Sequence, residues 1–388
     1  MCGRRASGAR WGLFGGPGFP ASAPASPVLP VSSRVSFTCL KCAALRILTR
    51  YPACMCGVNA LKCVPHLILV LHVSGPCGGE GRSSLVDYVL IALSAVIAVL
   101  LVAAVASDST RLWLGLTSLG EESAYVVLSI AVMTLIDADT GVASLLAVIA
   151  SGALVIWLKE VFALPRPPRA LWREPAEGYG FPSGHTQVSA SFWSLLSLRF
   201  RRVGLAVLSV AVVAAIATSR VGLHVHYVRD VLGGAAFGLI VGACVWALIM
   251  GPGRRFLAGP PISRVALALP ALSIVVGVLS LWEGFAYGFD TSFKLGGLAF
   301  SLLTYPFLAL RIRVLSHAPL PVRVSGFIAT TVVALVLTGV SKRLAEAAGA
   351  WVYGPAYFFV GLAILVVAAA TPSLVLKRLE STRAGSGT

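Results

Sequence analysis

The fold class of this chain is decided by residues 86–106, which read VDYVLIALSAVIAVLLVAAVA. Asp87 is the single charged residue in this run, and about 20 apolar residues are enough for a helix to cross a lipid bilayer. The whole chain of 388 residues is 57% hydrophobic and only 12% charged, whereas soluble domains carry about 25% charge. The sequence therefore predicts an all-α protein, a polytopic bundle of transmembrane helices.

Apolar runs of similar length repeat from this stretch to the end of the chain. We expect a core of six helices in residues 85–250 and an extension of about four transmembrane helices in residues 251–388, divided at the Pro/Gly-rich segment Gly251–Pro261. The fourth candidate, Gln187–Phe200, is short and rich in serine, so it should lie inside the bundle rather than face lipid. The ten candidates are residues 86–106, 123–137, 141–163, 186–200, 203–220, 228–250, 264–283, 293–312, 322–340 and 354–376.

Residues 1–84 differ from the rest in composition. The segment has Pro, Ser and Gly clusters, and seven of the eight cysteines precede residue 78. We interpret it as a disordered leader, or as upstream sequence included by a misassigned start. The alternative is a zinc site built from its cysteines, whose members would be Cys39, Cys42, Cys54, Cys56 and Cys63.

Positive charge is distributed as membrane orientation requires. The formal net charge is +16, but no basic helix carries interleaved aromatic residues, so nucleic acid is not an expected partner. Loops on the side where the chain enters its first helix hold thirteen Lys and Arg, against four on the other side once six near the polar clusters described next are set aside. The positive-inside rule makes the first side cytoplasmic, with both termini there.

Three polar clusters interrupt the apolar pattern at helix ends. They read KEVFALPRP at residues 159–167, FPSGH at 181–185 and SRVGLHVHYVRD at 219–230. The first ends the third helix, the second begins the fourth, and the third joins the fifth to the sixth. Because consecutive spanning helices alternate in direction, all three clusters should share the extracytoplasmic face.

The clusters together contain the groups that phosphate binding needs. Lys159, Arg166 and Arg220 supply three cations, and guanidinium groups match phosphate oxygens two at a time. Ser183 and Gly184 open a helix, whose free N–H groups favour an anion.

The same clusters contain groups for phosphoryl transfer. His226 and Asp230 are four residues apart, so they lie on one face of a helix. A carboxylate on one ring nitrogen leaves the other as the nucleophile, and His185 remains to protonate the leaving oxygen. With no carboxylate cluster suited to Mg²⁺, we expect neither metal nor cofactor.

In order and spacing, the clusters resemble the motifs KxxxxxxRP, PSGH and SRxxxxxHxxxD of the type 2 phosphatidic acid phosphatase superfamily. The resemblance extends over about residues 86–250 and implies a membrane phosphatase that acts on a lipid phosphate or pyrophosphate. It implies His226 as nucleophile, Asp230 as its partner and His185 as acid. It implies phosphate binding by Lys159, Arg166, Ser183, Gly184 and Arg220.

The chain departs from many relatives beside the nucleophile. His224 replaces a glycine, Val228 a proline and Arg229 a serine, which leaves the substrate preference open. Arg169 and Arg173, like Arg229, could bind a second phosphate or merely lipid headgroups.

Several alternatives follow from the same residues. The chain could be a small-molecule phosphomonoesterase of the glucose-6-phosphatase type, or a non-enzymatic lipid transporter or scaffold on this fold. The latter predicts a degraded site, and every motif residue is intact. Glu121 and Glu122, between the first two helices, are interpreted as solvated loop charges. Membrane lipids are the other expected partners, and the oligomeric state is left open.

Overall fold

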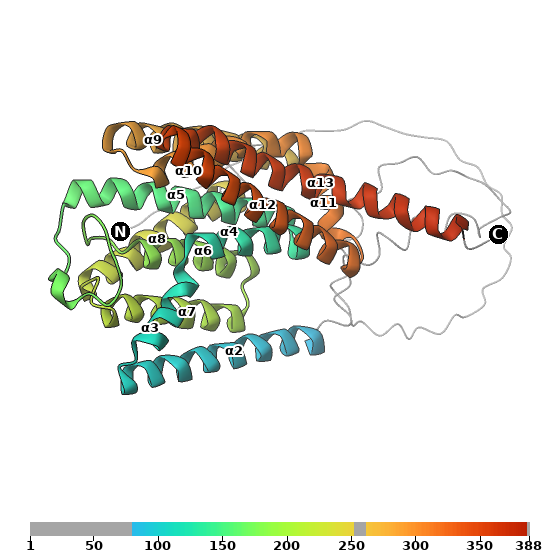
Figure 1. Cartoon of the computed structure of the whole chain (residues 1–388). Helices are drawn as coiled ribbons and strands as arrows, with labels where there is room; N and C mark the ends of the chain where they lie inside the picture. The colour runs from blue at the N-terminus through green and yellow to red at the C-terminus, as the bar shows by residue number, and fades with distance from the viewer. Residues whose placement is uncertain (1–79, 252–260, 386–388) are drawn as a thin grey trace, which may run out of the picture. The chain divides into compact units, whose positions relative to one another are not determined.

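The computed structural model describes residues 80–251 and 261–385, and every regular element in that part of the chain is helical (Figure 1). This confirms the predicted all-α class. The alternative zinc site and residues 1–79 of the expected leader lie outside the described ranges, as does most of the Pro/Gly-rich segment; residues 80–84 of that leader belong to a helix.

Helices occur at all ten predicted positions, but the one expected at residues 186–200 is not among the candidate membrane spans. Those of the core are α2 (Glu80–Ser107), α4 (Glu122–Ala131), α5 (Ala138–Phe162), α6 (Gly184–Phe200), α7 (Val203–Gly222) and α8 (Val228–Ile249). Those of the extension are α9 (Pro261–Tyr287), the consecutive pair α10 (Asp290–Ser301) and α11 (Tyr305–His317), α12 (Leu320–Ala348) and α13 (Tyr353–Gly385). Within the described residues, eight spans are long and apolar enough to cross a membrane, or nine if one bent pair counts as a span.

The bent pair differs from the single helix expected at residues 123–137. A short helix α3 (Thr110–Thr117) and the 3-10 turn η2 (Ser118–Gly120) precede α4, which continues into the π turn η3 (Val132–Ile136), and the two halves meet at 50°. The chain breaks at Gly120, where an added Cβ would lie 2.9 Å from Ile216 and 3.1 Å from His185. Close packing against α6 and α7 therefore requires glycine at the break.

Helix α6 lies inside the core, as its polar sequence predicted. Residues Thr186–Phe192 are all buried, and α8 packs closely along α6. The approach depends on Gly234, Gly238 and Gly242 of α8, because an added Cβ at these positions would lie 2.1–2.6 Å from atoms of α6. Small residues spaced by four are a common means of bringing membrane helices together. This packing sets the start of α8 beside the start of α6.

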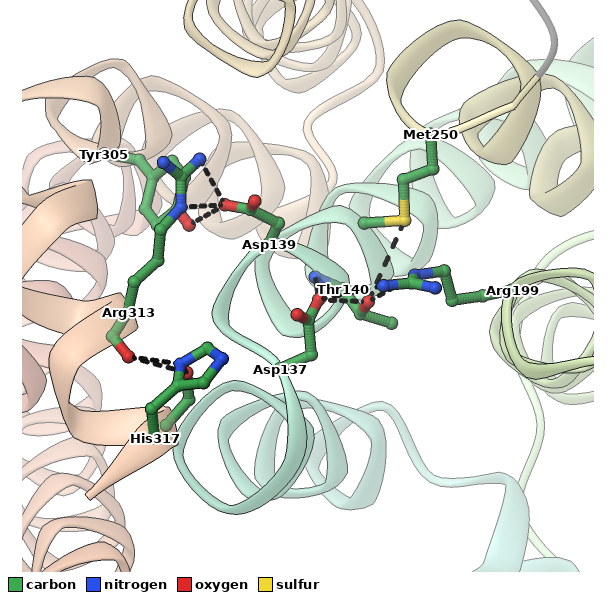
Figure 2. A network of polar contacts seen from close by, with 9 residues as sticks. Asp137, Asp139, Thr140, Arg199, Met250, Tyr305, Arg313 and His317 are labelled. Carbon is green, nitrogen blue, oxygen red and sulfur yellow. Dashed lines mark hydrogen bonds and ion pairs between the residues drawn. The ribbon is translucent and has the colours of Figure 1, made fainter. Parts of the chain in front are cut away.

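The extension is joined to the core by a partly buried polar network at the start of α5 (Figure 2). One carboxylate oxygen of Asp139 accepts hydrogen bonds from the Tyr305 hydroxyl and from Nε and Nη2 of Arg313, the latter two at 3.0 and 2.9 Å. Arg323 of α12 also donates to the carbonyl of Leu135 at 2.6 Å. The described residues belong to one compact unit, so the extension packs as part of the core's own bundle.

Candidate active site

Arg166 is the centre of the polar cluster between the ends of α5 and α7. Its Nη1 donates to the carbonyl of Val225 at 2.9 Å and lies 2.9 Å from Nε2 of His226. Its Nε and Nη2 donate to the carbonyls of Gly178 and Glu177 at 3.0 and 2.8 Å. The loop after α5 therefore folds around Arg166 and holds it against the segment that joins α7 to α8. The first and third sequence clusters meet here.

His226 is held between a cation and a carboxylate. Its Nδ1 lies 3.4 Å from Oδ2 of Asp230, and both side chains are almost completely buried. Arg166 can only donate, so its contact requires an unprotonated Nε2 and places the ring proton on Nδ1, which faces Asp230. This is the tautomer in which Nε2 carries a free electron pair.

Asp230 is itself fixed by the backbone at the start of α8. Its Oδ2 accepts the N–H of Tyr227 at 2.9 Å, and its carbonyl accepts the N–H of Ser183 at 2.9 Å. The second contact joins the start of α8 to the start of α6. At Gly180 an added Cβ would lie 3.0 Å from Oδ2 of Asp230, so only a small residue fits there.

Electrostatics keep the His226 ring neutral. Burial lowers the pKa of His226 below its usual range, and the nearby cations Arg166, Arg220 and Lys159 lower it further, against the opposing effect of Asp230. Burial, with Arg220 nearby, also lowers the pKa of Arg166 to about 10, so this guanidinium stays charged at neutral pH. Lys159 lies in the last turn of α5.

The start of α6 forms a further part of the site. Ser183 is the N-cap residue, fully buried, and Gly184 begins the helix. N–H groups in the first turn of a helix lack intrahelical partners, so they are available to an anion. His185 follows, and its Nε2 lies 3.5 Å from Oε1 of Glu121.

The interpretation of Glu121 as a solvated loop charge is therefore incomplete. Its side chain is half exposed, yet it is the carboxylate that faces the His185 ring. Nothing in the local sequence indicates this contact, since 64 residues separate the two. It arises because η2 packs against the start of α6.

The carboxylate of Glu174, which the sequence did not single out, forms an ion pair with Arg220. Glu174 Oε2 accepts from Arg220 Nη1 at 2.8 Å, and the same nitrogen donates to the Thr117 hydroxyl at 2.9 Å. The side chain of Arg220 is only 4% exposed, and its Nε is buried without a hydrogen-bond partner. A carboxylate thus occupies the guanidinium that the motif assigns to phosphate.

Arg173 and Arg169, which could have bound a second phosphate, contact other side chains. Arg173 forms a two-point ion pair with Asp108, at 2.7 Å for each contact, and this pairing lowers the pKa of Asp108 to about 2. The guanidinium of Arg169 stacks 5.6 Å from the Trp172 ring. Arg173 thus ties the loop after α5 to the turn between α2 and α3.

The structure does not explain why histidine stands at position 224. His224 has a φ of +58°, a conformation that favours glycine, which is the residue many relatives carry there. Arg229 stacks 4.9 Å from the Tyr227 ring and contacts Asp230 Oδ1 at 3.4 Å.

The fold and this arrangement define a class. The protein is a helical membrane protein in which cations, a helix start and a neutral histidine paired with an aspartate converge at one end of the bundle. Within residues 80–251 and 261–385, no three His, Cys, Asp or Glu side chains group closely enough to hold a metal ion.

Comparison with known families agrees with this class. The family model of the PAP2 superfamily matches residues 140–253, from the start of α5 to just past the end of α8, so this part of the chain is similar to a PAP2 superfamily domain. Such a domain indicates a phosphatase or phosphoesterase. The match begins later than the expected residue 86 and leaves α2 to α4 outside. No curated protein and no solved structure matches the chain.

Proposed function

We propose that this protein hydrolyses a lipid-linked phosphate or pyrophosphate through a phosphohistidine intermediate on His226, without a metal ion. The observation that supports this most is the position of the His226 ring between a carboxylate and a guanidinium. Asp230 faces Nδ1, and Arg166, the cation expected to bind phosphate, faces Nε2 at 2.9 Å. The free electron pair therefore points towards the place where Arg166 would hold a phosphoryl group.

The first step would proceed in line. Nε2 of His226 attacks phosphorus while the bond from phosphorus to the leaving oxygen breaks. Arg166 exchanges its contact with Nε2 for a phosphoryl oxygen, and Arg220, Lys159 and the first turn of α6 neutralise the other oxygens. Asp230 stabilises the positive charge that develops on the ring.

The leaving oxygen would take its proton from His185. In the second step a water molecule attacks phosphorus, His185 accepts a proton from that water, and the bond from phosphorus to Nε2 breaks. Inorganic phosphate is released and both histidines return to their starting states. Water is the only co-reactant, so the sequence of steps balances.

The expected substrate is a membrane lipid, with a polyprenyl pyrophosphate first and a phosphatidate-like lipid second. The distribution of Lys and Arg supports a site on the extracytoplasmic face, with both termini in the cytoplasm. The plasma membrane is the membrane we expect. The apolar helices around the site support a substrate that arrives within the bilayer.

The decisive experiment traps the intermediate. Rapid-quench labelling with a ³²P-labelled lipid phosphate should give an acid-labile phosphoenzyme in the wild type and none in His226→Ala. His224→Gly is the matched control, because it alters a histidine two residues away and provides the residue that a φ of +58° favours. It should still form the phosphoenzyme. Robust turnover by His226→Ala would exclude this nucleophile.

The two alternatives predict other outcomes of the same assay. A phosphatase of the glucose-6-phosphatase type would form the phosphoenzyme with a soluble sugar phosphate but not with a lipid. A transporter or scaffold would form none with any substrate. The complete set of motif residues favours an enzyme.

A further inference from the structure

An apolar groove of about 680 Å³ lies between α2, α4 and α7. Trp193 of α6 and Leu208 and Val212 of α7 line it, and Leu335 of α12 contributes from the extension. Its one charged lining residue is Glu121. Ligand sites commonly have this volume and this apolar character.

Two of the helices that line the groove, α6 and α7, also carry residues of the candidate site. Trp193 lies eight residues after His185, and Val212 lies eight residues before Arg220. Residues at i, i+4 and i+8 fall within one broad stripe of a helix surface, and eight residues span about 12 Å of helix. Trp193 and Val212 therefore lie about 12 Å along their helices from His185 and Arg220.

Glu121 connects the groove to the proposed acid. It lines the groove, and its Oε1 lies 3.5 Å from Nε2 of His185. In an in-line displacement the nucleophile and the leaving oxygen lie on opposite sides of phosphorus. The leaving group, which carries the hydrocarbon chain of a lipid substrate, is therefore on the His185 side, where the groove comes closest to the site.

We propose that this groove binds the hydrocarbon chain of the substrate, and that Leu335 gives the C-terminal extension a part in chain binding. The proposal rests on the proposed function. It applies equally to a phosphate monoester and to a pyrophosphate, because in either case the departing fragment carries the chain.

A second apolar groove provides the internal comparison. It has a volume of about 590 Å³, lies between α6, α7 and α8, and also includes Trp193. None of its lining residues is charged, and none is among the residues assigned to catalysis or phosphate binding. It therefore lacks the link to the acid that Glu121 gives to the first groove.

The test places a bulky side chain in one groove at a time. Ala124 lines the first groove and Ala214 the second, so Ala124→Trp and Ala214→Trp are matched changes. We would measure kcat/KM for a long-chain lipid phosphate and for a water-soluble aryl phosphate, and take the ratio. The ratio should fall at least tenfold in Ala124→Trp and stay at the wild-type value in Ala214→Trp. Leu128→Trp, on the same groove, provides a second variant if the first fails to fold.

A binding measurement separates this proposal from the proposed function. An alkyl phosphate with a photoreactive diazirine in its chain would be cross-linked to full-length His226→Ala in detergent, and the labelled peptides mapped. Labelling of α4 and α7 at Val127 and Val212 supports the groove even if turnover is never detected. Labelling of α8 at Ala235 or Leu239, or a ratio that falls only in Ala214→Trp, would overturn it.

Discussion

Glu174 is predicted to compete with the substrate phosphate for Arg220. Its carboxylate lies 2.8 Å from Nη1 of an arginine whose side chain is only 4% exposed, so phosphate can reach this nitrogen only after the carboxylate leaves. A hydrogen bond to a charged group contributes about 1.5–3 kcal/mol. Glu174→Gln keeps an acceptor oxygen but removes the charge. We therefore expect the contact of residue 174 with Arg220 to weaken by about 1.4 kcal/mol, which corresponds to a tenfold change in an equilibrium constant.

The measurement is the Kd of inorganic phosphate by isothermal titration calorimetry in detergent at pH 7. Glu174→Gln should bind phosphate about tenfold more tightly than the wild type. Without phosphate, the variant should unfold at a lower temperature, because Arg220 is left buried with a weaker partner. Glu177→Gln removes the same charge from an exposed position in the same loop, and should leave Kd within about twofold. An unchanged or larger Kd for Glu174→Gln would refute the idea of competition.

Four further outcomes are expected. Activity should survive excess EDTA, and loss on chelation with recovery on adding Mg²⁺ or Zn²⁺ would contradict the metal-free mechanism. Because burial lowers the pKa of His226, its ring stays neutral as pH falls through 6.5, the ordinary value for histidine. The rate of phosphoenzyme formation should therefore fall on acidification only below pH 6.5. A fall with its midpoint at or above that pH would argue against a neutral buried ring. In a background without native cysteines, Glu177→Cys should react with an impermeant maleimide in intact cells and Arg201→Cys only after lysis; the reverse would place the site in the cytoplasm. Asp139→Asn should lower the thermal unfolding temperature, because Arg313 loses its charged partner, and an unchanged temperature would mean that this network does not stabilise the extension.

The positions of the helices could be predicted because the signal is local. A run of about 20 apolar residues has one stable form in lipid, since every backbone polar group must be paired within the segment. Two parts of the prediction failed. Helix α6, expected as a span, is not among the candidate spans of the described residues. Helix α3 was not expected, and it is separated from the second predicted helix by a bend at Gly120, where the chain packs against α6 and α7. That contact depends on residues far along the chain.

The convergence of the three clusters could also be predicted, because helices that alternate in direction leave few possibilities. The spacing of His226 and Asp230 follows from the helical period, and the structure brings them within 3.4 Å. Arg166 contacts His226, as expected if the first and third clusters lie on the same face of the membrane. The roles of these residues in catalysis remain predictions.

By itself, then, the sequence determined the helices, their alternation and the face on which the polar clusters meet, because each depends on segment length and local spacing. Only the tertiary structure decided that Glu174 pairs with Arg220 across 46 residues and Glu121 with His185 across 64. It also decided that a groove opens beside the acid. Loops have no period that predicts their contacts, and a groove is formed by faces of helices whose relative placement depends on the packing of the whole bundle.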